Sequence, residues 1–340
     1  MATQALLNFG NMSGKWLLSG VQYHKPKAMS QTTLHHVRYF RRVTDASKQT
    51  KSPFTSELTK PGPIHLTRLW KPLGFSIMFS SASIVGSAIW EYENIRARTQ
   101  RLVHRFEFTR VRRTGWRATV HNWWNSLDEG KKLFVPICFI NVLVFCAWRV
   151  PALQGTMLRY FCSNPNSSAM CWPMVLSTFS HYTILHLAAN MFVLNSFSSP
   201  VVAALGKEQF LALYLTSGVM SNLVSYFYKT VFSRPGLSLG ASGAIMGILS
   251  FACTQYPDSR LSIIFLPMYT FTADSAIKAM VCLDTIGCIM KWQFFDHAAH
   301  LGGAAWGIFW QKWGNAYIWQ KREPILTFWH EFRGPPRSRS

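Results

Sequence analysis

Long apolar runs, separated by short charged or polar segments, fill most of the chain after residue 70. A helix needs about 20 apolar residues to cross the hydrocarbon core of a bilayer. The pattern predicts seven membrane-spanning helices, at 72–90, 133–148, 174–197, 209–228, 238–256, 275–290 and 297–310. Pro267 and Asp274 interrupt the apolar stretch before the sixth span, which predicts a loop or re-entrant segment there. We therefore expect an all-α polytopic membrane protein.

Charge patterning divides the chain into four regions. A connector at 91–132 holds ten Lys or Arg residues and separates the first span from a block of six. The regions that we expect are a leader (1–55), an N-terminal region with the extra span and the connector (56–132), the six-span block (133–318) and a polar C-terminal tail (319–340).

Composition supports the membrane interpretation. Charged residues make up 14% of the chain, against about a quarter in soluble domains. The net charge of +21 raises the alternative of nucleic-acid binding. Much of the excess lies before residue 120, and no nucleic-acid module is recognisable, so charged loops beside spans explain it better. The seven cysteines form no C-x-x-C pair, which argues against a disulfide framework or a zinc finger.

The leader has the composition of an organelle import presequence. Residues 1–44 contain six Lys or Arg residues and many Ser and Thr, and the first acidic residue is Asp45. A disordered basic tail is the alternative. A secretory signal would need a longer apolar core than this segment offers.

Small residues predict that two of the spans lie against each other. Gly243 and Gly247 form one pair four residues apart, and Gly303 and Gly307 form another. Such pairs let helix backbones approach closely in lipid. Ser242 precedes the first pair, and a histidine lies three residues before the second. Close packing would bring hydroxyl and imidazole to the same depth.

Two further polar residues share a face of the third span. His186 and Asn190 are four residues apart in "HYTILHLAAN", and His181 lies earlier in the same stretch. Histidine and asparagine can both donate hydrogen bonds to an oxyanion, which is worth about 3 to 4 kcal/mol for one well-placed donor. The alternative is a polar contact between helices, typically worth about 1 kcal/mol.

Taken together, "GASG" with Ser242, "AHLGG" with His300 and "HYTILHLAAN" resemble motifs of the rhomboid family of intramembrane serine proteases. The match covers the six-span block. The extra span, the import-like leader and stretches such as "FFDHAAHLGG" look like the mitochondrial branch of that family. The resemblance implies a rhomboid six-helix bundle with one extra N-terminal transmembrane helix (1+6), as a multi-pass protein of the mitochondrial inner membrane.

The resemblance also implies a role for each motif residue. Ser242 would be the nucleophile and His300 the general base and then acid, as a dyad that needs no aspartate. His186, Asn190 and the backbone N–H of Ser242 would hold the oxyanion, and Gly240 would let the backbone turn just before the nucleophile. No cofactor or metal is implied.

The substrates that the resemblance implies are single-pass transmembrane proteins of the mitochondrion, cleaved within the bilayer in processing and quality control. Other membrane proteins could join it in a complex, and no nucleic acid is implied. The alternatives are a catalytically inactive rhomboid-like protein that binds membrane helices, and a transporter that uses the histidines and Asp284. The presence of both serine and histidine favours the protease.

Two positions depart from the family pattern. The long loop before the third span has Trp172-Pro173 where many rhomboids have Trp-Arg, and Met246 stands where some bacterial members have a tyrosine under the histidine. We expect weaker positioning of the histidine or a substitute contact.

Three acidic or imidazole groups near the last span allow other interpretations. Asp296 and His297, with His300 and the third-span histidines, could in principle bind a metal, but no H-E-x-x-H motif is present. Asp284 could be a third catalytic member or a proton relay, although a contact between helices is the more common role. We expect Asp296 to lie at the membrane interface.

Overall fold

A computed structural model describes residues 65–103, 114–234, 236–263 and 266–334. The expected import leader (1–55) and the middle of the Arg-rich connector lie outside the described residues. The described part of the chain is mostly helical, and four of its helices are long and apolar enough to cross a membrane. They are α3 (Trp70–Val103), α5 (Glu129–Ala147), α8 (Ile184–Leu205) and α9 (Lys207–Val231). The prediction of an all-α polytopic membrane protein is confirmed.

Three further helices follow in the region where we expected the last three spans. These are α10 (Ser242–Gln255), a shorter apolar helix, then α11 (Ala273–Met290) and α12 (His297–Phe309). A π-helix, η5 (Trp310–Trp319), continues α12. Each of the seven helices overlaps the span predicted for it, but the division into one plus six membrane-spanning helices stays a prediction.

Several local signals set where these helices begin. Thr183 accepts a hydrogen bond from the backbone N–H of His186 at the start of α8, and Thr272 accepts one from Ser275 at the start of α11. Asp296 does the same for Ala299 at the start of α12. Side chains that accept from the first free N–H groups of a helix are its usual N-caps. These caps fix the residue at which each of the three helices begins.

The third span begins later than the predicted 174–197. Short helical turns occupy the start of that range, namely α7 (Pro173–Leu176) and η4 (Ser177–Phe179), before α8 begins. The chain between η4 and α8 is extended at Ser180. There the ring Nε2 of His181 accepts the backbone N–H of Ala241, 3.3 Å away. His181 therefore lies in a loop that supports the segment before α10.

A β-hairpin forms between α10 and α11, where we predicted a loop or re-entrant segment. Strands β1 (Arg260–Ile263) and β2 (Leu266–Thr272) pair antiparallel. The run "RLSI" and the later "MYTFT" alternate residue types and are rich in β-branched and aromatic residues, which favours a strand over a loop. This hairpin is the one strand pair in the described residues.

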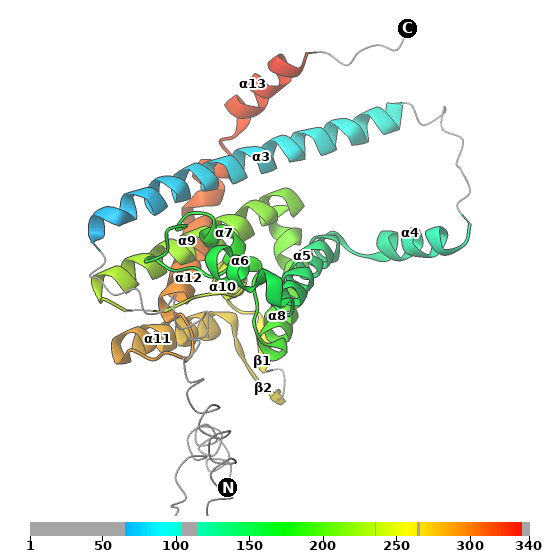
Figure 1. Cartoon of the computed structure of the whole chain (residues 1–340). Helices are drawn as coiled ribbons and strands as arrows, with labels where there is room; N and C mark the ends of the chain where they lie inside the picture. Colours follow the sequence, from blue (N-terminus) through cyan, green and yellow to red (C-terminus); the bar gives the residue numbers. More distant parts are fainter. Residues whose placement is uncertain (1–64, 104–113, 235, 264–265, 335–340) are drawn as a thin grey trace, which may run out of the picture. The chain divides into compact units, whose positions relative to one another are not determined.

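Five shorter elements complete the described part of the chain. They are η2 (Leu66–Leu69), α4 (Trp116–Ser126) in the connector, η3 (Pro151–Leu153), α6 (Gln154–Tyr160) and α13 (Glu323–Arg333). The last of these forms within the segment predicted as a polar tail, and it lies beside α3 (Figure 1). Arg322, just before α13, pairs with Glu91 of α3 at 2.6 Å, and the indole N–H of Trp329 donates to Glu93 at 3.0 Å.

The centre of the bundle is formed by α9, α10 and α12, which pack directly against one another (Figure 1). A Cβ on Gly303 would come well under 3.0 Å from the carbonyl oxygen of Gly243, and one on Gly307 would meet that of Gly247 in the same way. Gly243 and Gly247 also make room on their other side for Ser221 and Ser217 of α9. The predicted contact between the two glycine pairs is confirmed.

Candidate active site

Ser242 and His300 lie within hydrogen-bonding distance. Ser242 is the first residue of α10 and His300 lies in the first turn of α12. The Oγ of Ser242 is 3.0 Å from the Nε2 of His300, although 58 positions separate the residues in sequence. The glycine packing of α10 against α12 holds the two helix starts together, so the sequence prediction of this contact is confirmed as geometry.

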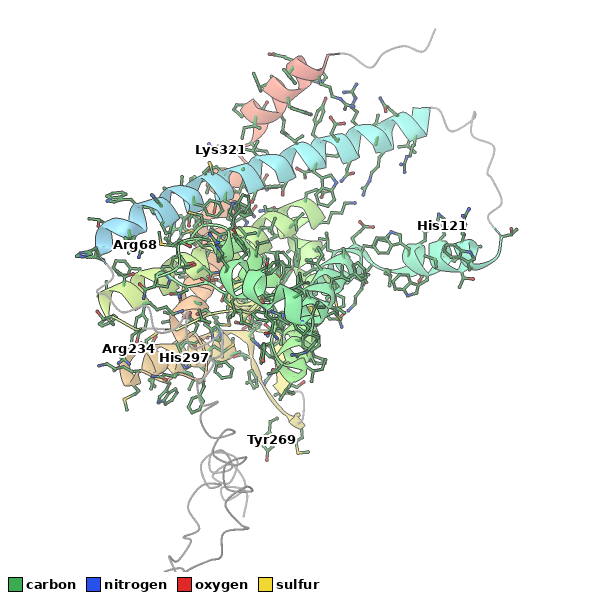
Figure 2. The ribbon with its side chains drawn as sticks, viewed as in Figure 1. Arg68, His121, Arg234, Tyr269, His297 and Lys321 are labelled. Atoms are coloured by element: carbon green, nitrogen blue, oxygen red, sulfur yellow. The ribbon has the colours of Figure 1, made fainter. Side chains whose placement is uncertain are left out.

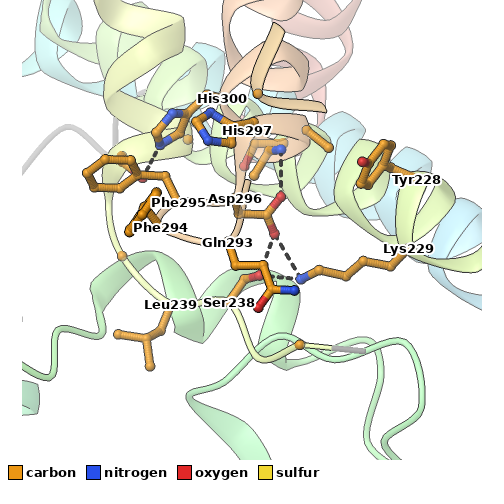
Figure 3. A pocket seen from close by; sticks show the side chains of 18 of the residues that line it. Tyr228, Lys229, Ser238, Leu239, Gln293, Phe294, Phe295, Asp296, His297 and His300 are labelled. Atoms are coloured by element: carbon orange, nitrogen blue, oxygen red, sulfur yellow. Dashed lines mark hydrogen bonds and ion pairs between the residues drawn. The ribbon is translucent and has the colours of Figure 1, made fainter. Parts of the chain in front are cut away.

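A cavity of about 510 Å³ surrounds this pair. Its walls come from the end of α9, the segment before α10, the end of α11 and the start of α12 (Figure 3). Arg234 and His297, both labelled in Figure 2, line this cavity. The hydroxyl of Ser242 therefore lies at a cavity that is lined by both polar and apolar side chains. Such a space can admit water and part of a peptide chain.

His186 is the predicted oxyanion donor that lines this cavity. Gly240, two residues before the nucleophile, has φ of 134°, a conformation that favours glycine. A Cβ there would lie 2.8 Å from Cε1 of His186, so the glycine also makes room for the imidazole. The N–H of Gly240 donates to the carbonyl of Ser177 at 2.9 Å. The tight turn expected at Gly240 is thus present, and its own N–H points elsewhere.

Asn190, the other predicted donor, is turned away. Its side-chain Nδ2 donates to the carbonyl oxygen of His186 in the same helix at 2.8 Å. The residue is 8% exposed and is absent from the described residues that line the cavity. The backbone N–H of Ser242 lies at the N-terminus of α10, where the first amides of a helix have no partner within it. This N–H is therefore better placed to bind an anionic group than the side-chain amide of Asn190, which is turned away.

Asp284 lies on the far side of the histidine. Its Oδ1 is 3.2 Å from Nδ1 of His300 and 2.6 Å from Nδ1 of His297. The three side chains bring potential metal-ligating atoms within 4.8 Å of one another. The set that the sequence allows in principle shares His297 and His300 with this cluster but has Asp296 and the third-span histidines in place of Asp284. The carboxylate of Asp296 caps α12 and pairs with Lys229, 2.9 Å away, so it is committed elsewhere.

The loop before the nucleophile is fastened to this ion pair. Ser238 donates a hydrogen bond to Asp296 and accepts one from Lys229, and Ser225 of α9 donates to the same carboxylate at 2.5 Å (Figure 3). The backbone of Ser238 also pairs with that of Ser163. Sequence reasoning missed Lys229 and Ser238. The available signal was that both polar residues precede the apolar run that begins at residue 239.

Aromatic contacts are found near both places where the sequence departs from the family pattern, namely Met246 and the Trp172-Pro173 pair in the long loop. The ring of Phe295 lies 6.1 Å from that of His300, centroid to centroid, while Met246 packs in the apolar core beside Gly303. In the long loop, Trp172 makes an edge contact with Phe75 of α3 at 5.9 Å. Aromatic residues thus supply contacts at both positions. The "FF" before Asp296 was the signal for the first.

Comparison with known proteins identifies close relatives. The rhomboid domain model matches residues 168–314. "Presenilin-associated rhomboid-like protein, mitochondrial" of Homo sapiens is 49% identical over 293 residues, which cover 84% of this chain and 77% of that protein. The similarly named protein A of Danio rerio is 44% identical over 290 residues, covering 78% and 76%. "Rhomboid protein 1, mitochondrial" of Saccharomyces cerevisiae is 32% identical over 180 residues, covering 52% of each chain.

Proposed function

The chain belongs to the rhomboid family, among its mitochondrial members, and from this premise we propose that it cleaves transmembrane segments of other mitochondrial membrane proteins with Ser242 and His300. The family supports an intramembrane protease role in a multi-pass mitochondrial membrane protein. The distance of 3.0 Å between Ser242 Oγ and His300 Nε2 is the observation that carries the finer proposal. It lies within the reach that proton transfer to a general base requires.

The reaction that these two residues support is acyl transfer to serine. Ser242 Oγ attacks the carbonyl carbon of the scissile peptide bond as its proton passes to Nε2 of His300. His300 then gives that proton to the leaving amine, and a water molecule, activated by the same imidazole, hydrolyses the acyl-enzyme. Lying at the N-terminus of α10, Ser242 is in the positive field of the helix, which favours the negative charge that develops.

The oxyanion of the tetrahedral intermediate needs donors beside the nucleophile. The N–H of Ser242 and the imidazole of His186 are the two groups whose positions support this role. Asn190 can join them after its amide leaves the carbonyl of His186. Gly240 acts through the backbone, because its conformation and missing Cβ let His186 reach the cavity.

Substrates of this site are transmembrane helices of single-pass proteins. A peptide bond inside a helix is shielded by its own hydrogen bonds, so the helix must unwind locally before serine can reach the carbonyl. We propose the inner mitochondrial membrane as the location, with residues 1–55 as the import presequence and 133–318 as the protease domain. Processing and quality control of mitochondrial proteins is the role that fits such a substrate class.

Reconstitution tests the proposal. Purified protein is placed in liposomes with single-span mitochondrial proteins, and cleavage products are followed for the wild type, Ser242→Ala and His300→Ala. Both variants should lose cleavage while keeping the thermal unfolding temperature of the wild type. Ser196→Ala is the control, because among the described residues that exposed hydroxyl bonds only to the carbonyl of Phe192 in its own helix. Full cleavage by Ser242→Ala would overturn the proposal, and substrate binding without cleavage by every form would identify an inactive helix-binding protein.

A further inference from the structure

The carboxylate of Asp284 lies beside the ring nitrogen of His300 that does not face Ser242. It lies within α11, 6% exposed, and faces α12. An ionisable side chain on a helix of a membrane protein is costly unless it is paired, and its usual place is a polar interior. Its Oδ1 is 3.2 Å from Nδ1 of His300, the nitrogen that Ser242 does not use. Ser242, His300 and Asp284 thus form a continuous chain of hydrogen bonds.

A second histidine holds the same oxygen. Nδ1 of His297 is 2.6 Å from Oδ1 of Asp284. The other ring nitrogen of His297 is buried and has no hydrogen-bond partner among the described residues. The ring therefore makes its single hydrogen bond through Nδ1, and it donates this bond to the carboxylate. Asp284 accepts from two imidazoles at once.

Glycine makes this arrangement possible. Gly287 lies almost one turn after Asp284 on α11, and a Cβ there would lie 2.6 Å from Cδ2 of His297. The imidazole rests directly on the backbone of α11. Trp292 and Phe295 pack around the same ring, with centroids 5.8 and 6.2 Å away. The position of His297 is set by these three contacts, and it in turn sets the orientation of the carboxylate.

We propose that Asp284 is a positioning residue, which holds His300 with its proton on Nδ1 so that Nε2 faces Ser242 as a free base, and that His297 holds the carboxylate in place. This inference rests on the proposed protease function and adds a third member to its catalytic unit. The carboxylate also stabilises the imidazolium that forms when the serine proton moves to Nε2, as the aspartate of soluble serine proteases does.

The test compares Asp284→Asn, which keeps the shape of the side chain, with Asp284→Glu, which keeps the charge. For Asp284→Asn we expect kcat to fall by about 100-fold or more with little change in KM, because the amide favours the wrong tautomer of His300. The acidic limb of the profile of kcat/KM against pH should move to lower pH, since the imidazolium loses its stabilising charge. Asp284→Glu should recover at least part of the loss. A merely structural role predicts no such shift and no such recovery.

Asp274→Asn is the matched control. It removes an exposed carboxylate of the same helix that pairs with Lys278, and its cleavage rate should equal that of the wild type. A second readout uses the rate at which a fluorophosphonate probe labels Ser242, which reports nucleophile activation without any substrate. This rate should fall in Asp284→Asn and stay at the wild-type value in Asp274→Asn.

The two readouts separate this inference from the function on which it rests. If the probe labels the wild type, and Asp284→Asn is labelled and cleaves substrate at the same rates, the role of Asp284 is overturned and the protease function stands. A wild type that neither reacts with the probe nor cleaves would overturn both. If Asp284→Asn does not fold, Asp284→Glu and His297→Phe provide the test. His297→Phe removes the group that holds the carboxylate, so the proposal requires an altered pH profile in that variant.

Discussion

Lys229 at the end of α9 and Asp296 at the start of α12 form an ion pair, with 2.9 Å between Nζ and Oδ2. Both side chains are largely buried, and the loop that leads to the nucleophile is attached to the pair through Ser238. The start of the helix that carries His300 and the segment before the helix that carries Ser242 are therefore joined by one charged contact.

Removal of one partner should destabilise the protein strongly. Asp296→Ala leaves the ammonium of Lys229 buried without its counter-charge and removes the cap of α12, which should cost about 3 to 5 kcal/mol of unfolding free energy. Thermal unfolding in detergent measures the change. Lys278→Met is the control, because its pair with Asp274 is exposed and should be worth less than about 1 kcal/mol. Equal effects of the two variants would contradict the assignment.

The same ion pair predicts a loss of stability in acid. Burial by itself would raise the pKa of the Asp296 carboxyl, but the charge of Lys229 and hydrogen bonds from Ser225 and Ser238 hold that pKa well below its usual range. The pKa is then lower in the folded than in the unfolded protein, where it is about 3.9. This contribution is complete above about pH 4 and is lost as the pH falls toward the folded pKa.

Unfolding temperatures between about pH 6 and pH 3 measure this effect. The wild type should lose stability over that interval more steeply than Asp296→Asn, in which the group cannot titrate. Parallel curves for the two proteins would show that other carboxyl groups carry the acid response.

The glycine contact between α10 and α12 gives a third prediction. Gly307→Ala places a Cβ against the carbonyl of Gly247, so the helices must separate, and we expect a loss of about 3 kcal/mol or more. Cleavage should fall as well, because the separation lengthens the distance between Ser242 and His300. Gly86→Ala on α3 is the control, since its Cβ would meet no atom of the described residues beyond its own helix within 4 Å, and it should be neutral or stabilising.

A fourth prediction concerns the turn before the nucleophile. In Gly240→Ala the methyl group meets the ring of His186, and the backbone adopts a conformation unfavourable for alanine. We expect kcat to fall about tenfold or more through misplacement of the oxyanion donors, with a smaller change in unfolding temperature. Gly155→Ala in α6 is the control, because its Cβ would meet no atom of the described residues beyond its own helix within 4 Å and it does not line the cavity, so it should cleave normally. Equal activities of the two variants would remove Gly240 from the site.

Much of this arrangement could be predicted from the sequence because it follows from local patterns. Apolar runs locate the long helices, and glycines four residues apart identify the faces of α10 and α12 that touch. Once those faces meet, Ser242 and His300 must lie near each other, since each stands at a known position relative to a glycine.

The remaining contacts depend on the placement of helices that carry no such marks. Asp284 reaches His300 because α11 packs against α12 with this residue at the contact, and the role of Gly287 depends on the position of His297 against it. The orientation of Asn190 depends on a choice between its own helix and the cavity, which no sequence pattern encodes. The sequence predicts a loop in place of the hairpin after α10 because Pro267 and Asp274 interrupt the apolar run there, although strands β1 and β2 form.

The shortness of α10 has a consequence for what can be cut. The fourteen residues of α10 rise about 21 Å along the helix axis, whereas the hydrocarbon layer of a membrane is about 30 Å thick. If its far end meets one face of that layer, the serine stops about 9 Å beneath the other. A substrate is then selected by the depth in the bilayer at which its helix can unwind. Lipids with longer or shorter acyl chains would shift that depth relative to Ser242.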